Sequence, residues 1–175
     1  MGLDAVEIVM GWEESFGIQV SNEEAEKLRT PKQSIDLIAT KLHVDEGARF
    51  ACPSARAFYR LRRAIRASSV LKRNDITPKA PVRELIPSNR GTVWDAIRIA
   101  SGFSELPSPG WFSRHRTVGD FAKWAVLHSA HKLKSADEPW TYAEIRGVVR
   151  GVVEDVTGAK DFYDDADFVR DIGIG

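Results

Sequence analysis

The chain has 175 residues, enough for one domain or two small ones, and 43% hydrophobic residues suffice for a buried core. Its 25 Lys and Arg balance 25 Asp and Glu, and its single cysteine, Cys52, excludes an internal disulfide framework. The sequence shows neither an apolar run of membrane-spanning length nor a signal-peptide pattern. We therefore expect a soluble, cytoplasmic protein.

The balanced total charge hides an uneven distribution along the chain. Residues 54–134 hold 16 Lys and Arg against 5 Asp and Glu, a net charge of +11, and the rest of the chain carries −11. Because opposite charges attract, we expect these parts either to dock within the molecule or to recruit partners of opposite charge.

The first predicted element is an amphipathic helix within residues 3–18. Its polar stripe follows a spacing of three and four residues and consists of Asp4, Glu7, Gly11 and Glu14. The other faces are covered by Leu3, Val6, Val9, Met10 and Phe16. Gly17 stands where a helix ends in the left-handed conformation that costs glycine least.

Capping patterns predict where four further helices begin. They lie at residues 21–24, 30–33, 117–120 and 141–144. Apolar periodicity predicts two more helices, after Ser54 and from about Thr92 to Phe103. Residues 43–53 are expected to form a linker, residues 72–91 a long ordered loop and residues 158–175 an irregular acidic tail. No stretch alternates for long enough to predict a strand, so the expected fold class is all-α.

The helix after Ser54 is rich in arginine. The segment from Arg56 to Arg73 contains seven cationic residues and no acidic one. Its predicted basic face consists of Arg56, Arg60, Arg62, Arg63 and Arg66. Such a face suits an acidic protein surface, or alternatively an anion or a nucleic acid, for which only Phe58 and Tyr59 offer stacking rings. An acidic protein surface is the more economical partner.

The sequence repeats itself at a distance of 87 residues without a gap. The identical pairs include Val6 with Val93, Phe16 with Phe103, Arg29-Thr30 with Arg116-Thr117, and Arg63 with Arg150. Such self-similarity predicts two copies of one helical unit. One copy covers residues 54–131, and the other is split into residues 1–43 and 138–175, because either end alone would leave an apolar helix face uncovered. The ends meet either within a monomer or between the chains of a domain-swapped dimer.

Particular runs of sequence resemble acyl carrier proteins. The segments LDAVEIVMGWEESFGI, SNEEAEKL and TPKQSIDLI resemble the second, third and fourth helices of that family. The C-terminal EIRGVVRGVVEDVTG and DDADFVRDIGIG look like its first helix and the loop before its second, and the central copy is similar mainly in RTVGDFAKW. The resemblance implies two carrier-like helical bundles, one of them circularly permuted.

The resemblance also locates the position of the family's prosthetic group. Acyl carrier proteins hold acyl chains on a phosphopantetheine arm attached to the serine of an Asp-Ser-Leu motif. Aligning Leu3 with the leucine of this motif places Gly2 at the attachment position, and Asn89 is its counterpart in the central copy. Ser88 is a displaced attachment candidate. We therefore expect no cofactor, with 4'-phosphopantetheine present only under the alternative that Ser88 carries it.

The family's partner enzymes dock basic patches against acidic residues of the second helix. The matching acidic residues here are Asp4, Glu7, Glu13 and Glu14, whereas the central copy has Arg90 and Arg98. We expect a carrier-like, non-enzymatic adaptor that binds proteins of acyl-chain or peptide biosynthesis. The alternatives are a true acyl carrier that uses Ser88, and an anion or nucleic-acid binder that uses the basic helix.

Other candidate chemistry is sparse. His128 and His131 have a ligand-like spacing, but no second cluster of ligands completes a metal site, and Cys52 has no evident base partner. The sequence contains neither a phosphate-binding glycine loop nor the spacing of a catalytic triad. We expect no metal and no enzymatic activity.

Overall fold

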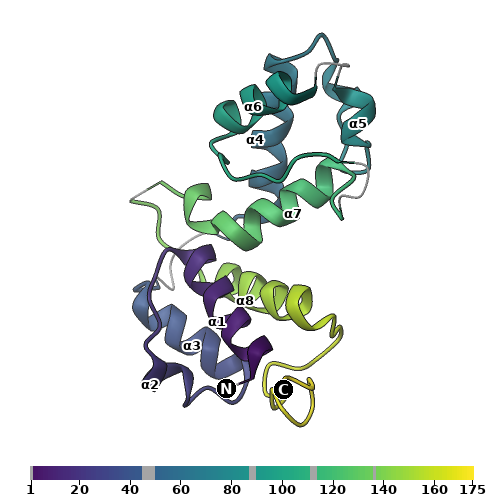
Figure 1. Cartoon of the computed structure of the whole chain (residues 1–175). Coiled ribbons are helices and arrows are strands. Elements are labelled where there is room, and N and C mark those ends of the chain that lie inside the picture. The colour runs from purple at the N-terminus through teal and green to yellow at the C-terminus, as the bar shows by residue number, and fades with distance from the viewer. Residues whose placement is uncertain (1, 45–49, 87–89, 111–113, 136) are drawn as a thin grey trace. The chain divides into compact units, whose positions relative to one another are not determined.

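The computed structural model of the chain describes residues 2–44, 50–86, 90–110, 114–135 and 137–175. Within these ranges the regular structure is helical and no strand forms, which confirms the predicted all-α fold class (Figure 1). The α-helices are α1 (Leu3–Phe16), α2 (Asn22–Ala25), α3 (Pro31–Lys41), α4 (Pro53–Ala67), α5 (Val82–Leu85), α6 (Arg90–Ser101), α7 (Val118–Ser129) and α8 (Tyr142–Thr157). Two 3₁₀ turns accompany them, η1 (Arg73–Asp75) and η2 (Ala130–Leu133).

The predicted capping patterns do begin helices. Ser21 accepts a hydrogen bond from the Glu24 N–H while the Glu24 carboxylate accepts one from the Ser21 N–H. The same reciprocal pair begins α7 at Thr117 and α8 at Thr141. Each pair satisfies two of the N–H groups that a helix start leaves without a partner.

The segment between residues 72 and 91 differs from the prediction of a long loop. It contains two short helical pieces, η1 of three residues and α5 of four residues. A helix of one turn is too short to show apolar periodicity, which is why the sequence pattern missed both pieces.

The chain divides into two compact units, Met1–Ala51 with Lys134–Gly175, and Cys52–Leu133. In the first unit α1 and α3 both pack on α8, so helices from the two ends of the chain share one core (Figure 1). The Nε1 of Trp12 donates to the carbonyl of Val149 at 3.3 Å. The ring of Phe16 meets that of Trp140 edge to face, with centroids 5.2 Å apart.

In the second unit α4 is the central helix and packs on α6 and α7. Leu61 and Ile65 of α4 are buried, and Trp94 of α6 lies 4.8 Å from Phe121 of α7, centroid to centroid. Burying side chains of this size contributes about 1.5–3 kcal/mol each. This core holds α4 in place and leaves its opposite side to solvent.

The buried side of α1 differs from the one predicted. It consists of Ile8, Trp12, Ser15 and Phe16. Leu3, Val6 and Met10, which were predicted to cover the apolar faces of the helix, are 80%, 39% and 61% exposed. Gly11 was assigned to the polar stripe, yet a Cβ built there would lie 2.7 Å from Cγ1 of Val152 on α8. That prediction was wrong because the missing side chain of Gly11 allows close helix packing rather than contact with water.

The irregular segment after α8 is held to its own unit by hydrogen bonds. The N–H of Lys32 donates to the carbonyl of Asp164 at 2.7 Å. The Asp164 carboxylate accepts from Arg146 at 2.5 Å and from Arg150 at 2.7 Å, both on α8. Partial burial acts to raise the pKa of Asp164, but the two guanidinium groups hold that pKa below its usual value.

Candidate functional site

The start of α1 lies against the end of the C-terminal segment. Gly2 is the N-cap of α1, and its carbonyl accepts a hydrogen bond from the N–H of Val6 at 3.3 Å. A Cβ built on Gly2 would overlap the carbonyl of Gly175. Position 2 therefore offers no hydroxyl, and in this arrangement it has no room for a side chain.

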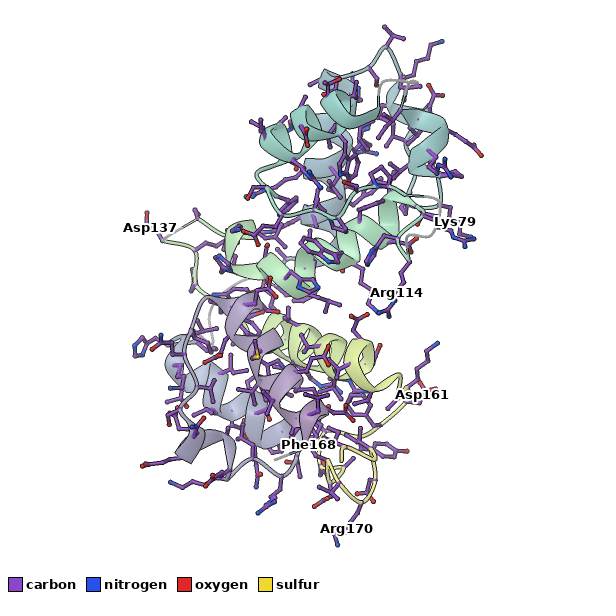
Figure 2. All side chains as sticks on the ribbon, in the orientation of Figure 1. Lys79, Arg114, Asp137, Asp161, Phe168 and Arg170 are labelled. Carbon is purple, nitrogen blue, oxygen red and sulfur yellow. The ribbon has the colours of Figure 1, made fainter. Side chains whose placement is uncertain are left out.

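Phe168 anchors the C-terminal segment beside α1. Its N–H donates to the carbonyl of Arg29 at 2.9 Å, and its carbonyl accepts from the N–H of Ile174 at 2.8 Å. Its ring lies 6.2 Å from the ring of Trp12. Figure 2 shows Phe168 where the C-terminal segment lies beside α1, and Arg170 at the outer edge of the same segment. The segment therefore forms one wall of a space whose other wall is α1.

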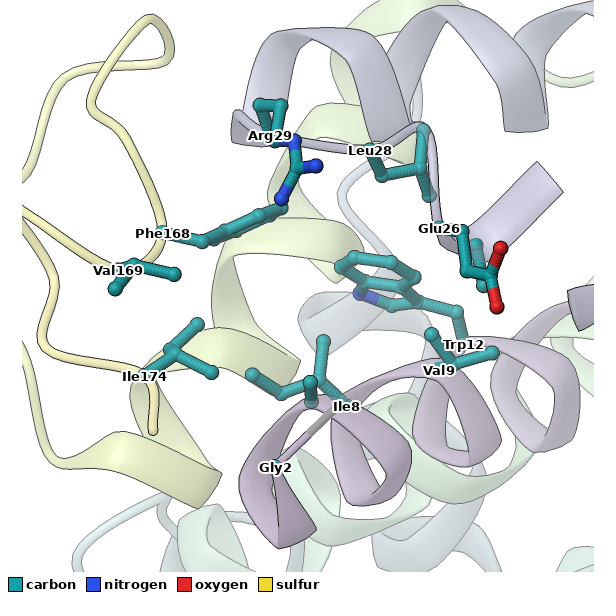
Figure 3. Close-up of a pocket in the computed structure, with 12 residues that line it drawn as sticks. Gly2, Ile8, Val9, Trp12, Glu26, Leu28, Arg29, Phe168, Val169 and Ile174 are labelled. Atoms are coloured by element: carbon teal, nitrogen blue, oxygen red, sulfur yellow. The ribbon is translucent and has the colours of Figure 1, made fainter. Parts of the chain in front are cut away.

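This space is a pocket of about 450 Å³, shown in Figure 3. Its apolar lining includes Ile8, Val9, Trp12, Leu28, Phe168 and Ile174. Glu26 and Arg29 bring charge to the lining, and Gly2 also borders the pocket. Ligand sites in proteins typically measure about 300–1,000 Å³ and have such a mostly apolar lining. The pocket can therefore take up a small apolar group next to the position aligned with the attachment serine.

The outer side of α1 combines apolar and acidic side chains. Leu3 and Met10 are largely exposed. Glu7, which lies between them in the sequence, and Glu14, about one turn after Met10, are also exposed. Residues 3, 7, 10 and 14 follow one line along a helix because successive members are three or four positions apart. We call Leu3, Glu7, Met10 and Glu14 the α1 stripe, and Val6 lies beside it.

The four acidic residues predicted for docking do not share one environment. Glu7 and Glu14 belong to the α1 stripe, and Asp4 is half-buried in the first turn. Glu13 faces the turn after the helix, where its Oε1 accepts a hydrogen bond from the N–H of Val20 at 2.8 Å. Glu13 thus holds the chain where it leaves α1, close to Gly17, whose φ of 66° is left-handed as predicted.

Two of the five arginines predicted as a basic face on α4 bind backbone carbonyls of their own unit. Arg60 donates to the carbonyl of Lys132 at 2.6 Å and to that of Leu133 at 3.4 Å. Arg56 donates to the carbonyl of Leu133 at 3.3 Å. Carbonyls at a helix end lack partners within the helix, so these guanidinium groups cap η2.

Of the other three arginines, Arg62 is half-buried like Arg56 and Arg60. The guanidinium of Arg62 sits 5.1 Å from the ring centroid of Phe58 and 4.7 Å from that of Tyr59. Such cation–π contacts fix the orientation of an arginine. Arg63 and Arg66 are exposed. The exposed positive charge of α4 is therefore concentrated at these two residues.

Several other residues singled out in the sequence do not form a site here. Ser88 and Asn89 lie outside the described residues, as does the side chain of Arg90. His128 stacks on Trp124 with ring centroids 4.4 Å apart. In the described part of the chain, no group of three or more His, Cys, Asp or Glu is arranged to hold a metal ion. Cys52 is exposed at the start of α4.

Glu144 organises a buried polar cluster that the sequence reasoning did not recognise. Its carboxylate is 2% exposed and accepts from the ammonium of Lys134 at 2.8 Å and from the N–H of Ala51 at 3.3 Å. Lys134 also lies 4.9 Å from the ring centroid of Trp140. The capping pattern at residues 141–144 was a signal for the position of Glu144, but not for its burial or for these distant partners.

The chain is similar to acyl carrier proteins over a limited length. It is 54% identical over 39 residues to the acyl carrier protein of Buchnera aphidicola subsp. Acyrthosiphon pisum (strain 5A), which is 22% of this chain and 49% of that protein. It is 48% identical over 40 residues to the acyl carrier protein of Thermosynechococcus vestitus, 23% of this chain and 49% of that protein. One segment of the chain is acyl carrier protein-like.

A third relative, the chloroplastic acyl carrier protein of Brassica napus, is 58% identical over 36 residues, or 21% of this chain and 27% of that protein. The chain thus spans about half the length, or less, of the curated relatives it matches. No protein-family profile and no solved structure matches the chain. Among the described residues, no helix combines the length and the apolarity needed to cross a membrane.

Proposed function

We propose that the chain is a carrier-like, non-enzymatic docking module that acts without a phosphopantetheine arm. Through α1 it binds the basic surface of an enzyme of acyl-chain or peptide biosynthesis. The observation that carries this proposal is the α1 stripe, an exposed line of apolar and acidic side chains on a helix whose other side is buried.

The composition of the stripe supports a protein partner. Leu3 and Met10 expose apolar surface beside Val6, and such a patch gains free energy when a partner covers it. Among the described residues no cation forms an ion pair with Glu7. An exposed acid next to apolar contacts favours a partner with a basic patch, because charge complementarity speeds association and selects the partner.

The residues at the attachment position do not fit a phosphopantetheine arm. Forming the phosphodiester requires a hydroxyl at the start of the helix, and Gly2 has none. A side chain at position 2 would also meet the carbonyl of Gly175. The proposal therefore assigns no group transfer to this site. The similarity to acyl carrier proteins supports docking to the kind of enzyme that recognises such carriers.

A binding assay tests the docking role. A ketosynthase that accepts acyl carrier proteins is immobilised, and binding of the chain is measured by biolayer interferometry at two salt concentrations. We expect binding that weakens as salt rises, since exposed charges are screened within about 8 Å at 0.15 M. Glu7→Arg should weaken it about tenfold or more, since it replaces attraction by repulsion at the interface.

Glu23→Arg is the matched control, because Glu23 is an exposed acid on α2 and lies outside the α1 stripe. It should bind like the wild type. Equal binding by the wild type and Glu7→Arg would contradict the proposal, and so would the absence of binding to a panel of carrier-dependent enzymes.

A further inference from the structure

A second exposed line of side chains lies on α4. Tyr59, Arg63 and Arg66 are exposed and follow one another along α4 at intervals of four and three residues, and Val70, four residues further, is exposed in the turn after the helix end at Ala67. Tyr59 is 52% exposed and Val70 is fully exposed. We call Tyr59, Arg63, Arg66 and Val70 the α4 stripe. Like the α1 stripe, it combines exposed charge with exposed apolar surface.

The positive charge of the α4 stripe has no acidic partner in the part of the chain that the structure describes. No ion pair or hydrogen bond involves the side chain of Arg63 or Arg66 there. The sequence from Ser54 to Asn74 contains no Asp or Glu. The repulsion between the two arginines is therefore relieved only by solvent and salt, or by an acidic surface that covers the stripe.

The two stripes match in spacing and differ in sign. The α1 stripe occupies positions 3, 7, 10 and 14, and the α4 stripe occupies positions 59, 63, 66 and 70, so both follow the same 4-3-4 spacing. The α1 stripe extends about 16 Å along its helix at about 1.5 Å per residue, and the helical part of the α4 stripe, from Tyr59 to Arg66, extends about 10 Å. In an antiparallel pair Leu3 lies opposite Val70, and Glu7 lies opposite Arg66. The same alignment places Arg63 opposite Met10 and Tyr59 opposite Glu14.

From this match we infer that the chain associates with a second copy of itself, the α1 stripe of one copy docking on the α4 stripe of the other. The contact joins two different surfaces, so each copy keeps one stripe open and association continues from copy to copy. This inference goes beyond the proposed docking to enzymes and does not depend on it. Its consequence is that self-association covers the α1 stripe and competes with any enzyme that binds there.

Sedimentation velocity of the full chain over a range of concentrations tests the inference. Three samples are compared at low salt: Glu7→Arg with Glu14→Arg, Arg63→Glu with Arg66→Glu, and an equimolar mixture of the two variants. Each variant alone carries two stripes of like charge and should remain monomeric. The mixture pairs an acidic with a basic stripe in both directions, so its weight-average sedimentation coefficient should rise with concentration, as that of the wild type does.

Circular dichroism of each variant shows whether the variant is folded, which separates a loss of association from unfolding. Lys123→Glu with Glu23→Arg is the matched control, since both residues are exposed and lie outside the two stripes, and it should associate like the wild type. A monomeric wild type at every concentration and salt would overturn the inference. So would a mixture that stays monomeric, the result expected if the stripes dock only within one chain or bind only other proteins.

Discussion

At the scale of single residues, Glu144 and Lys134 form an ion pair that is 2% and 6% exposed, respectively. Burial acts to raise the pKa of Glu144, but the Lys134 ammonium and the N–H of Thr141 hold it below the usual 4.5. Glu144→Gln leaves a buried ammonium with a weaker partner, so we expect unfolding free energy to fall by about 3 kcal/mol at pH 7. Chemical denaturation followed by circular dichroism measures this loss.

The pH dependence of this stability loss tests whether the charge of the Glu144 carboxylate causes it. Because the pKa in the folded state lies below 4.5, the stabilisation by the Glu144 carboxylate is complete above that value and is lost as the pH falls through the folded pKa. The stability difference between the wild type and Glu144→Gln should therefore be constant near neutral pH and shrink below pH 4.5. A difference independent of pH down to acid unfolding would contradict an ionic origin.

Gly11 tests the close packing of α1 on α8. Gly11→Ala places a methyl group 2.7 Å from Cγ1 of Val152, and overpacking of this kind costs about 1–3 kcal/mol, offset by about 1 kcal/mol of helix propensity. Val152→Ala makes room, so in that background Gly11→Ala should become neutral or stabilising. Gly147→Ala is the control, because nothing lies within 4 Å of its added Cβ and it should stabilise by up to about 1 kcal/mol. Thermal unfolding of the full double-mutant cycle measures the coupling.

At the scale of elements, α8 covers both α1 and α3. Its inner side consists of Ile145, Val148, Val149, Val152 and Val153, all nearly or fully buried. Deleting residues 138–175 removes this helix together with the segment that carries Phe168. We expect α1 and α3 to lose their protection from hydrogen exchange while α4, α6 and α7 keep theirs. Mass spectrometry of proteolytic fragments reads out each helix, and persistent protection of α1 in the truncated chain would argue against the shared core.

Most helices could be predicted from the sequence, because their starts have local chemical signals. The capping pairs at Ser21, Thr117 and Thr141 act over three residues and do not depend on the rest of the fold. The four-residue helix α5 has no such capping pair and is too short to show apolar periodicity. The orientation of α1 was mispredicted because glycine has no polarity of its own, and only the position of Val152 on a distant helix shows what Gly11 faces.

The candidate site could be predicted only in part. Glu7 and Glu14 were identified as acidic residues of α1, but the exposure of their apolar neighbours Leu3 and Met10 was not predicted, since hydrophobic residues are more often buried. The carbonyls bound by Arg60 come from η2, more than 70 residues away in the chain, and no local pattern indicates such a contact. The pocket beside α1 could not be predicted for the same reason, because its walls come from segments that are distant in the sequence.

At the scale of the whole molecule, the excess positive charge and the candidate site lie in different parts of the chain. The excess of positive charge falls within residues 54–134, whereas the α1 stripe and the apolar pocket belong to the unit with the opposite excess. Ser88, which precedes the predicted attachment position Asn89, lies in the basic part of the sequence and outside the described residues. A test of covalent modification must therefore include Ser88, because Gly2 has no hydroxyl.

The central claim, docking without a prosthetic arm, is tested most directly by intact-mass spectrometry. The chain is incubated with coenzyme A and a promiscuous phosphopantetheinyl transferase, beside an acyl carrier protein as positive control. We predict no mass gain in the chain and complete conversion of the control, because Gly2 has no hydroxyl to form the phosphodiester. A gain equal to one phosphopantetheine group, abolished by Ser88→Ala, would contradict the account and make the protein a true acyl carrier.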